Sequence, residues 1–139
     1  MSTATNKAVL RRFFEEIFNK GHLSVADEIV AIDYVNHTPA PGEQPGREGL
    51  KGFVTYLRAA FPDIHFTVDQ QVTEGETAVT RLTLTGTQQG EFAGIPATGK
   101  PVNVTAINIH RVSDEQIQEA WINWDALGMM QQLGAIPSP

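Results

Sequence analysis

The stretch Leu57-Arg-Ala-Ala-Phe-Pro-Asp-Ile-His-Phe-Thr-Val68 decides the fold, because the spacing of its apolar residues changes at Pro62. Before the proline, apolar residues recur every three or four positions, which is typical of an amphipathic helix. After it, apolar and polar residues alternate, which is typical of a strand with one buried face. The chain therefore divides into a helical first part and a β-rich second part.

Helices are predicted before Pro62 and again at the C-terminal end. The first covers about 9–18 and ends at Asn19-Lys-Gly21, and a short second helix runs from Ser24 to about Val30. A third helix covers 50–61, and the last begins at 126 and ends at about Leu133. All of them carry apolar residues at helical spacing.

Strands are predicted for most of the remaining chain. They are an extended segment at 33–38, before a Pro-rich loop at 39–46, and the segments that begin at 64, 77, 102 and 117. Helices first and hairpins afterwards predict an α+β fold, with helices packed on one face of a curved antiparallel sheet. The length and the lack of a linker predict a single domain over residues 1–139.

The composition limits the classes of partner. Of the 139 residues, 41% are hydrophobic and 19% are charged, which is typical of a globular protein. The net charge is −6 and the basic residues are scattered, so neither nucleic acid nor an anionic membrane is expected as a partner. The absence of cysteine excludes disulfides and a cysteine nucleophile. No signal peptide or membrane-spanning run is found, so a cytoplasmic location is expected.

The last two predicted strands form a hairpin whose register can be worked out. If 113–116 is the loop, Val112 faces Ile117, and antiparallel pairing follows from there. The predicted pairs are His110 with Glu119, Asn108 with Trp121, and Ala106 with Asn123. These residues would then share one polar face with Asp125. The other face would carry Ile107, Ile109, Ala120, Ile122 and Trp124.

Asp125 lies between the last strand and the last helix and allows two interpretations. It is either an N-cap that accepts hydrogen bonds from free helix amides, or a base at the mouth of an apolar pocket, and one Asp can do both. The predicted pairing places it near Val104, about 20 Å along the strand from His110, so no direct Asp–His pair is expected. His110 could equally be a hydrogen-bonded core histidine, and His37 a turn residue before the Pro-rich loop.

Several motifs follow one another along nearly the whole chain. They are Tyr34-Val-Asn-His37, Phe61-Pro-Asp63, Gly86-Thr-Gln-Gln-Gly-Glu-Phe-Ala-Gly-Ile-Pro-Ala-Thr-Gly99, Asn108-Ile-His110, and Asp125 followed by Gln132-Leu-Gly134. In this order they resemble the SnoaL-like polyketide cyclases (ester cyclases) of the NTF2-like superfamily. The chain departs from the common pattern at Gln88, where many members carry His, and at Asp114-Glu115, where Asp-Gly is usual.

The resemblance implies an NTF2-like, cystatin-like cone: a curved sheet wrapped by helices around a deep apolar pocket, dimerised through the sheet. It implies that Asp125 is the general acid/base of an intramolecular aldol ring closure, with His110 as the second catalytic candidate. The substrate would be a small hydrophobic molecule that contains carbonyl groups, and no cofactor or metal is expected. Taken with the predicted polar face, it gives the substrate-binding candidates His37, Asn36, Asn108, Trp121, Asn123 and Tyr34.

The chemistry and its alternatives follow from the same residues. A carbon flanked by carbonyls is acidic enough for a carboxylate to deprotonate if burial raises the pKa of that carboxylate. A non-catalytic small-molecule-binding dimer and a proton-shuttling isomerase remain alternatives. An epoxide hydrolase is less favoured, because the Arg-x-Asp motif of that class is Arg81-Leu-Thr83 here and its second acid is Asn123.

Overall fold

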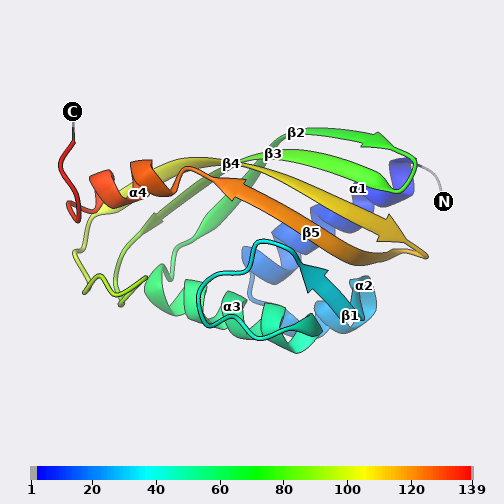
Figure 1. Ribbon diagram of the computed structural model, residues 1–139, viewed down its shortest axis with the longest axis horizontal. Coiled ribbons are helices and arrows are strands. Elements are labelled where there is room, and N and C mark those ends of the chain that lie inside the picture. Colours follow the sequence, from blue (N-terminus) through cyan, green and yellow to red (C-terminus); the bar gives the residue numbers. More distant parts are fainter. Residues whose placement is uncertain (1–2, 139) are drawn as a thin grey trace.

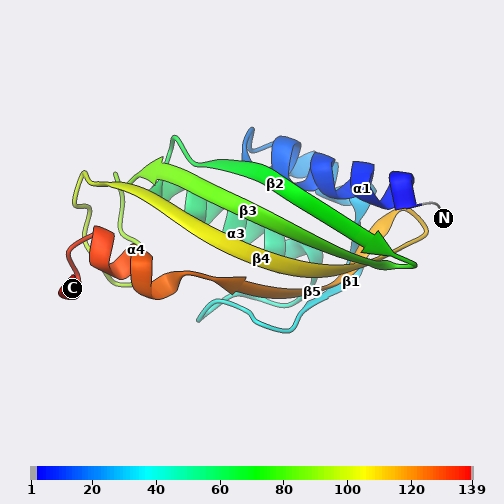
Figure 2. The same ribbon diagram turned by 90° about the horizontal axis from the view of Figure 1, so that it is seen from above.

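The computed structural model describes residues 3–138, in which the two longest helices lie on the same side of a twisted, five-stranded sheet (Figures 1 and 2). The helical segments are α1 (Thr3–Arg12), the π-helix η1 (Phe13–Phe18), the 3-10 turn η2 (Leu23–Val25), α2 (Ala26–Ile29), α3 (Gly46–Ala60) and α4 (Ala126–Gln132). Within this part of the chain, no helix combines the length and apolar composition needed to cross a bilayer.

The sheet has the strand order β1-β5-β4-β3-β2. Its strands are β1 (Val30–Asn36), β2 (His65–Glu74), β3 (Thr77–Thr87), β4 (Pro101–Ser113) and β5 (Gln116–Trp124). The antiparallel neighbours are those predicted, and the α+β fold class is confirmed. The sheet is mixed, however, because β1 joins its edge parallel to β5. The residues of β1 do not indicate whether this strand pairs parallel or antiparallel to its neighbour, so the sequence could not predict the parallel pair.

Two predicted helices differ in detail from the structure. The first ends in the π-helix η1, which buries Phe13, Phe14, Ile17 and Phe18 on the sheet side. The second is only four residues long, since the chain becomes extended at Val30 and enters β1. The β-branched and apolar run Val30-Ala-Ile32 gains more as an edge strand than as a further helical turn.

Alternation of burial along β3 and β4 defines the two faces of the sheet. Even-numbered residues of both strands face the helices and are buried, whereas the odd-numbered residues are more exposed. We call these the inner and outer faces. The core lies between the inner face and the apolar sides of α1, η1 and α3, as Figure 2 shows for the helix layer behind the strands. The inner face therefore forms one wall of the buried core.

The predicted register of the last hairpin is wrong beyond its first pair. Val112 does face Ile117, but an irregularity follows, and Arg111 pairs with Glu119 so that one residue of β5 is skipped. The pairs after it are His110 with Ala120, Asn108 with Ile122, and Ala106 with Trp124. A bulge of this kind moves every later side chain of one strand to the opposite face.

This bulge redistributes the predicted polar face. Asn108 and His110 remain on the inner face, but their neighbours there are Ala120, Ile122 and Trp124. Trp121 and Asn123 lie on the outer face, beside Ile109 and Ile107. The polar set expected on one surface is thus divided between two.

Candidate functional site

Asp125 follows the last residue of β5 and caps α4. Its Oδ1 accepts a hydrogen bond from the Gly128 amide at 2.9 Å, and its own amide donates to the Thr105 carbonyl at 3.0 Å. A side chain at position 128 would collide with this carboxylate, which explains the glycine. The capping interpretation is confirmed. The side chain is exposed, so the burial on which the catalytic argument depends is not present in the structure.

The carboxylate of Asp125 has no cationic partner among the residues that the structure describes. Its backbone is bonded to Thr105, and His110 lies five residues further along β4, or roughly 16 Å at 3.3 Å per residue. No contact joins the two side chains. This agrees with the expectation that Asp125 and His110 do not form a direct pair.

An aromatic cluster of Tyr56, Phe61, Phe92 and Trp124 lies next to Asp125. The ring of Phe92 is 6.4 Å from that of Trp124, 5.8 Å from that of Tyr56 and 5.4 Å from that of Phe61. Trp124 faces inward, yet 37% of it is exposed. The cluster therefore forms an apolar, partly open rim one residue away from the carboxylate. Sequence reasoning missed it because Phe92 lies in a loop.

The loop 88–100 carries Phe92 and is fixed by Gln88, which is fully buried. The Gln88 Nε2 donates to the Ile95 carbonyl at 2.9 Å, and its Oε1 accepts from the Thr98 amide at 3.1 Å and the Thr98 hydroxyl at 2.7 Å. The Tyr56 hydroxyl donates to Glu91 at 3.2 Å and accepts from the Ala93 amide at 2.7 Å. Gln88, where many family members carry His, thus holds this loop together through its side-chain hydrogen bonds.

His110 is completely buried in an aromatic environment. Its ring lies 5.4 Å from that of Phe13 and 6.1 Å from that of Phe14, and neither ring nitrogen has a hydrogen-bond partner. Burial lowers the pKa of His110 to about 4. The imidazole is therefore neutral at neutral pH, and it can offer one donor and one acceptor but not a cation.

Three further inner-face side chains near His110 have polar atoms without partners. They are Asn108 Oδ1, Thr80 Oγ1 and Gln71 Nε2. Gln71 pairs with Thr80 across β2 and β3, and Thr80 pairs with Asn108 across β3 and β4. We call Gln71, Thr80, Asn108 and His110 the buried polar row. Thr80 could have been found from sequence, since it is the one polar side chain at the inward positions 78–84 of its strand.

The remaining predicted site residues lie around β1 and the outer face. The His37 ring stacks on Trp121 at 4.6 Å, and its Nε2 lies 3.4 Å from Glu119. Asn36 is used inside the following loop, where its Nδ2 donates to Glu43 at 3.1 Å and its Oδ1 accepts from the Thr38 amide. These residues do not reach the buried polar row in the structure.

Tyr34 and Asn123 are also separate from that row. Tyr34 is buried on β1, where desolvation and the nearby Glu43 raise the pKa of its phenol. It lines a hollow of about 180 Å³ between β1 and the Pro-rich loop, together with Glu43 and Pro45. Asn123 is exposed on the outer face.

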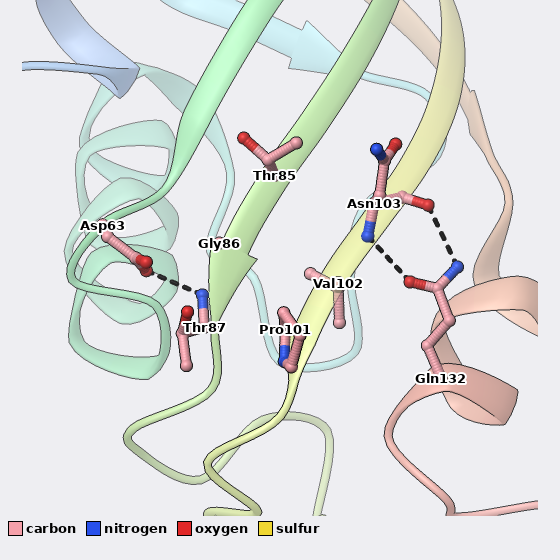
Figure 3. Close-up of a pocket in the computed structure, with 8 residues that line it drawn as sticks. All are labelled: Asp63, Thr85, Gly86, Thr87, Pro101, Val102, Asn103 and Gln132. Carbon is pink, nitrogen blue, oxygen red and sulfur yellow. Dashed lines mark hydrogen bonds between the residues drawn. The ribbon is translucent and has the colours of Figure 1, made fainter.

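A larger hollow of about 420 Å³ lies where α4 meets the ends of β3 and β4 (Figure 3). Asp63 accepts from the Thr87 amide on one side, and this bond lowers the pKa of its carboxyl. On the other side the Gln132 amide bonds both backbone groups of Asn103, at 2.7 and 3.0 Å. These polar groups satisfy one another, so the hollow is a structural junction.

Comparison with known proteins gives a consistent result. A family model described as SnoaL-like polyketide cyclase matches residues 8–133. The aklanonic acid methyl ester cyclase DnrD of Streptomyces peucetius is 30% identical over 131 residues, which are 90% of this chain and 88% of that protein.

Solved structures agree over almost the whole chain. TsrD from Streptomyces laurentii has a TM-score of 0.90 at 30% identity, covering 98% of this chain and 99% of that one. IdmH from Streptomyces antibioticus has a TM-score of 0.81 at 36% identity, covering 93% and 98%. The family predicted from the motifs is confirmed: the chain belongs to the SnoaL-like polyketide cyclases.

Proposed function

We propose that the protein is a cyclase that closes a carbon ring in a polyketide ester, or in a similar hydrophobic carbonyl compound, by an intramolecular aldol reaction. The observation that carries this proposal is the placement of Asp125. Its carboxylate follows the inward-facing Trp124 directly, is paired with no cation in the described chain, and uses Oδ1 for the cap. The other carboxylate oxygen remains available to take a proton.

The proposed reaction moves one proton out and back. Asp125 removes a proton from a carbon between two carbonyl groups, and the electron pair of the C–H bond forms an enolate. The enolate carbon attacks another carbonyl carbon of the same molecule, which forms the new C–C bond and an alkoxide. The alkoxide then takes the proton from the carboxylic acid of Asp125. The product is an isomer of the substrate, so the reaction consumes no cofactor.

Asn108 is the residue of the buried polar row that is best placed to hold a substrate oxygen. Among the members of the row on β3 and β4, it is 5% exposed, whereas Thr80 and His110 are at 0%. His110 lies behind Asn108 and would act as a neutral hydrogen-bonding group. Substrate contacts remain a prediction for the other candidates, which are Tyr34, Asn36, His37, Trp121 and Asn123. Trp121 and Asn123 could contact a substrate only on the outer face of the sheet.

The test compares Asp125→Asn with Asp114→Asn, a matched change of an acid in the β4–β5 turn. Aklanonic acid methyl ester serves as the probe substrate, and chromatography with mass detection follows its conversion to a product of the same mass. We expect Asp125→Asn to lose about a hundredfold or more of the activity, and Asp114→Asn to keep it. Undiminished turnover by Asp125→Asn would exclude Asp125 as the base.

A non-catalytic binding protein is the second candidate, and the exposed, capping geometry of Asp125 favours it. On this hypothesis the wild-type protein binds the ester without changing it. Absence of a product in the wild-type reaction, with binding measured by calorimetry, would support this candidate against the cyclase.

We also propose that the protein is a homodimer through the outer face of the sheet. Ile107, Ile109 and Trp121 form an apolar patch there, and Ile107 is 52% exposed. Apolar patches of this kind are typical of interaction sites. Light scattering on the wild type and Ile107→Glu tests this, with the variant expected to be a monomer. A monomeric wild type would contradict it.

A further inference from the structure

The buried polar row has a geometry that the fold alone does not require. Gln71, Thr80 and Asn108 occupy adjacent cross-strand positions on β2, β3 and β4, and His110 lies two residues beyond Asn108 on the same face. Cross-strand neighbours have their Cβ atoms about 4.5–5.5 Å apart, which is close enough for side chains to interact. Nevertheless, none of the polar atoms named above bonds to another within the row.

Unpartnered polar atoms in a core reduce stability. A buried donor or acceptor without a partner has lost its hydrogen bonds to water, and an apolar residue of the same shape is often as stable or more so. The inner-face neighbours of Thr80 on its own strand, Ala78 and Leu82, are apolar. Polar side chains kept at such positions call for an explanation, and a ligand is a principal one.

The donors and acceptors in the row select the ligand group. Gln71 Nε2 can only donate, Asn108 Oδ1 can only accept, and the Thr80 hydroxyl between them can do both. A carbonyl oxygen only accepts, so it would leave Asn108 Oδ1 without a partner. A hydroxyl group both donates and accepts, so it can bond to Gln71 Nε2, the Thr80 hydroxyl and Asn108 Oδ1 together.

The row lies on the same strand as the contacts of the aromatic rim. Asn108 pairs with the partly buried Ile122, and the next inner-face pair is Ala106 with Trp124, which belongs to the aromatic rim. The wall over His110 is the π-helix η1. Short π-helical segments occur frequently at functional sites. The row and the rim therefore lie in line along β4, and the exposed Asp125 comes directly after the rim.

We propose that the buried polar row binds a phenolic or enolic hydroxyl group of the ligand, with Gln71 and Thr80 as specificity-determining residues. The proposal rests on the proposed function only in placing the reacting end of the ligand near Asp125. A 1,3-dicarbonyl compound presents such a hydroxyl in its enol form. The row would then hold the far end of the substrate while the carboxylate acts at the rim.

The test is a binding experiment that does not depend on turnover. Calorimetry measures the affinity of the wild type for 2-naphthol and for 2-methoxynaphthalene, which has the same ring system and no hydroxyl hydrogen. We expect 2-naphthol to bind about fivefold to tenfold more tightly, as one or two net hydrogen bonds provide. Thr80→Val and Gln71→Leu should each remove most of this preference. Thr85→Val, on the outer side of the same strand, should keep it.

Thermal unfolding separates loss of binding from loss of the fold. Because Thr80 Oγ1 has no partner, Thr80→Val should keep or raise the Tm of the unliganded protein. Equal affinity for the two probes, no binding of 2-naphthol, or an equal effect of Thr85→Val would overturn the proposal. If the protein binds the hydroxyl probe selectively but does not cyclise the ester, the hydroxyl site is supported and the cyclase function is rejected. If it cyclises the ester without this selectivity, the cyclase function is supported and the hydroxyl site is rejected.

Discussion

His110 should make the stability of this protein depend on pH above the range in which its shifted carboxyl groups contribute. Burial lowers its pKa from 6.5 to about 4 in the folded protein, while in the unfolded chain it keeps the ordinary value. Between these two values the unfolded state binds more protons than the folded state. The stabilising contribution of the neutral imidazole is therefore fully present above pH 6.5, and it is lost as the pH falls toward 4.

The expected magnitude follows from the two pKa values. Their difference corresponds to about 3 kcal/mol in total, and about 2 kcal/mol of it should be lost by pH 5. Four carboxyl groups also have lowered pKa values. In Glu16, Asp27 and Glu119 the main cause is a hydrogen bond from a basic side chain. In Asp63 it is a hydrogen bond from a backbone amide. Their contributions are lost only below their ordinary values of 3.8 and 4.5. The range between pH 5 and 7 thus isolates the histidine.

Urea unfolding followed by tryptophan fluorescence measures this dependence between pH 5 and pH 8. His110→Leu should be at least as stable as the wild type at pH 5 and should lose most of the slope. His65→Gln, at an exposed position of β2, is the matched control and should keep the slope. If the wild type and His110→Leu gave parallel curves, the buried, neutral state of His110 would be refuted.

Three further predictions concern local structure. Asp125→Ala should lower the Tm by about 3–5 °C, because it removes a helix cap worth about 1 kcal/mol. Asp125→Asn should leave the Tm unchanged, because Asn also caps helices. Equal Tm values for the two variants would contradict the capping role. Glu115 has a φ of 62°, a left-handed conformation that glycine adopts without strain. Glu115→Gly should therefore raise the free energy of unfolding in urea by about 0.5–1 kcal/mol. A lower free energy of unfolding would show that this turn conformation is not strained. Gln88→Leu should speed hydrogen exchange of the Thr98 amide, which donates to the Gln88 side chain. Exchange of the Gly99 amide, which donates to the Gln88 backbone carbonyl, should change less. Equal acceleration of both amides would contradict the role of the Gln88 side chain.

The helices, the antiparallel strands and the capping role of Asp125 could be predicted because local patterns determine them. The change of period at Pro62 separates α3 from β2, and an Asp directly before an apolar run is a helix start. The family could also be predicted, since its motifs are spread over nearly the whole chain.

The faces of β5 could not be predicted, because one skipped residue decides them. Nothing in Gln116-Ile-Gln-Glu119 marks the bulge, yet it exchanges Trp121 for Trp124 on the inner face. The aromatic rim was equally hidden, since it needs Phe92 from a loop and Tyr56 from α3 to meet Trp124. Such contacts depend on tertiary packing and leave no periodic pattern in the sequence.

The junction at α4 has a consequence for solubility. The first residues of β4 extend past the end of β5, and a bare strand of this kind invites pairing with another chain. Here Pro101 has no amide hydrogen to offer, both backbone groups of Asn103 are bonded to Gln132, and the Thr105 carbonyl accepts from the Asp125 amide. The helix that carries the proposed base therefore also protects this edge from strand addition and aggregation.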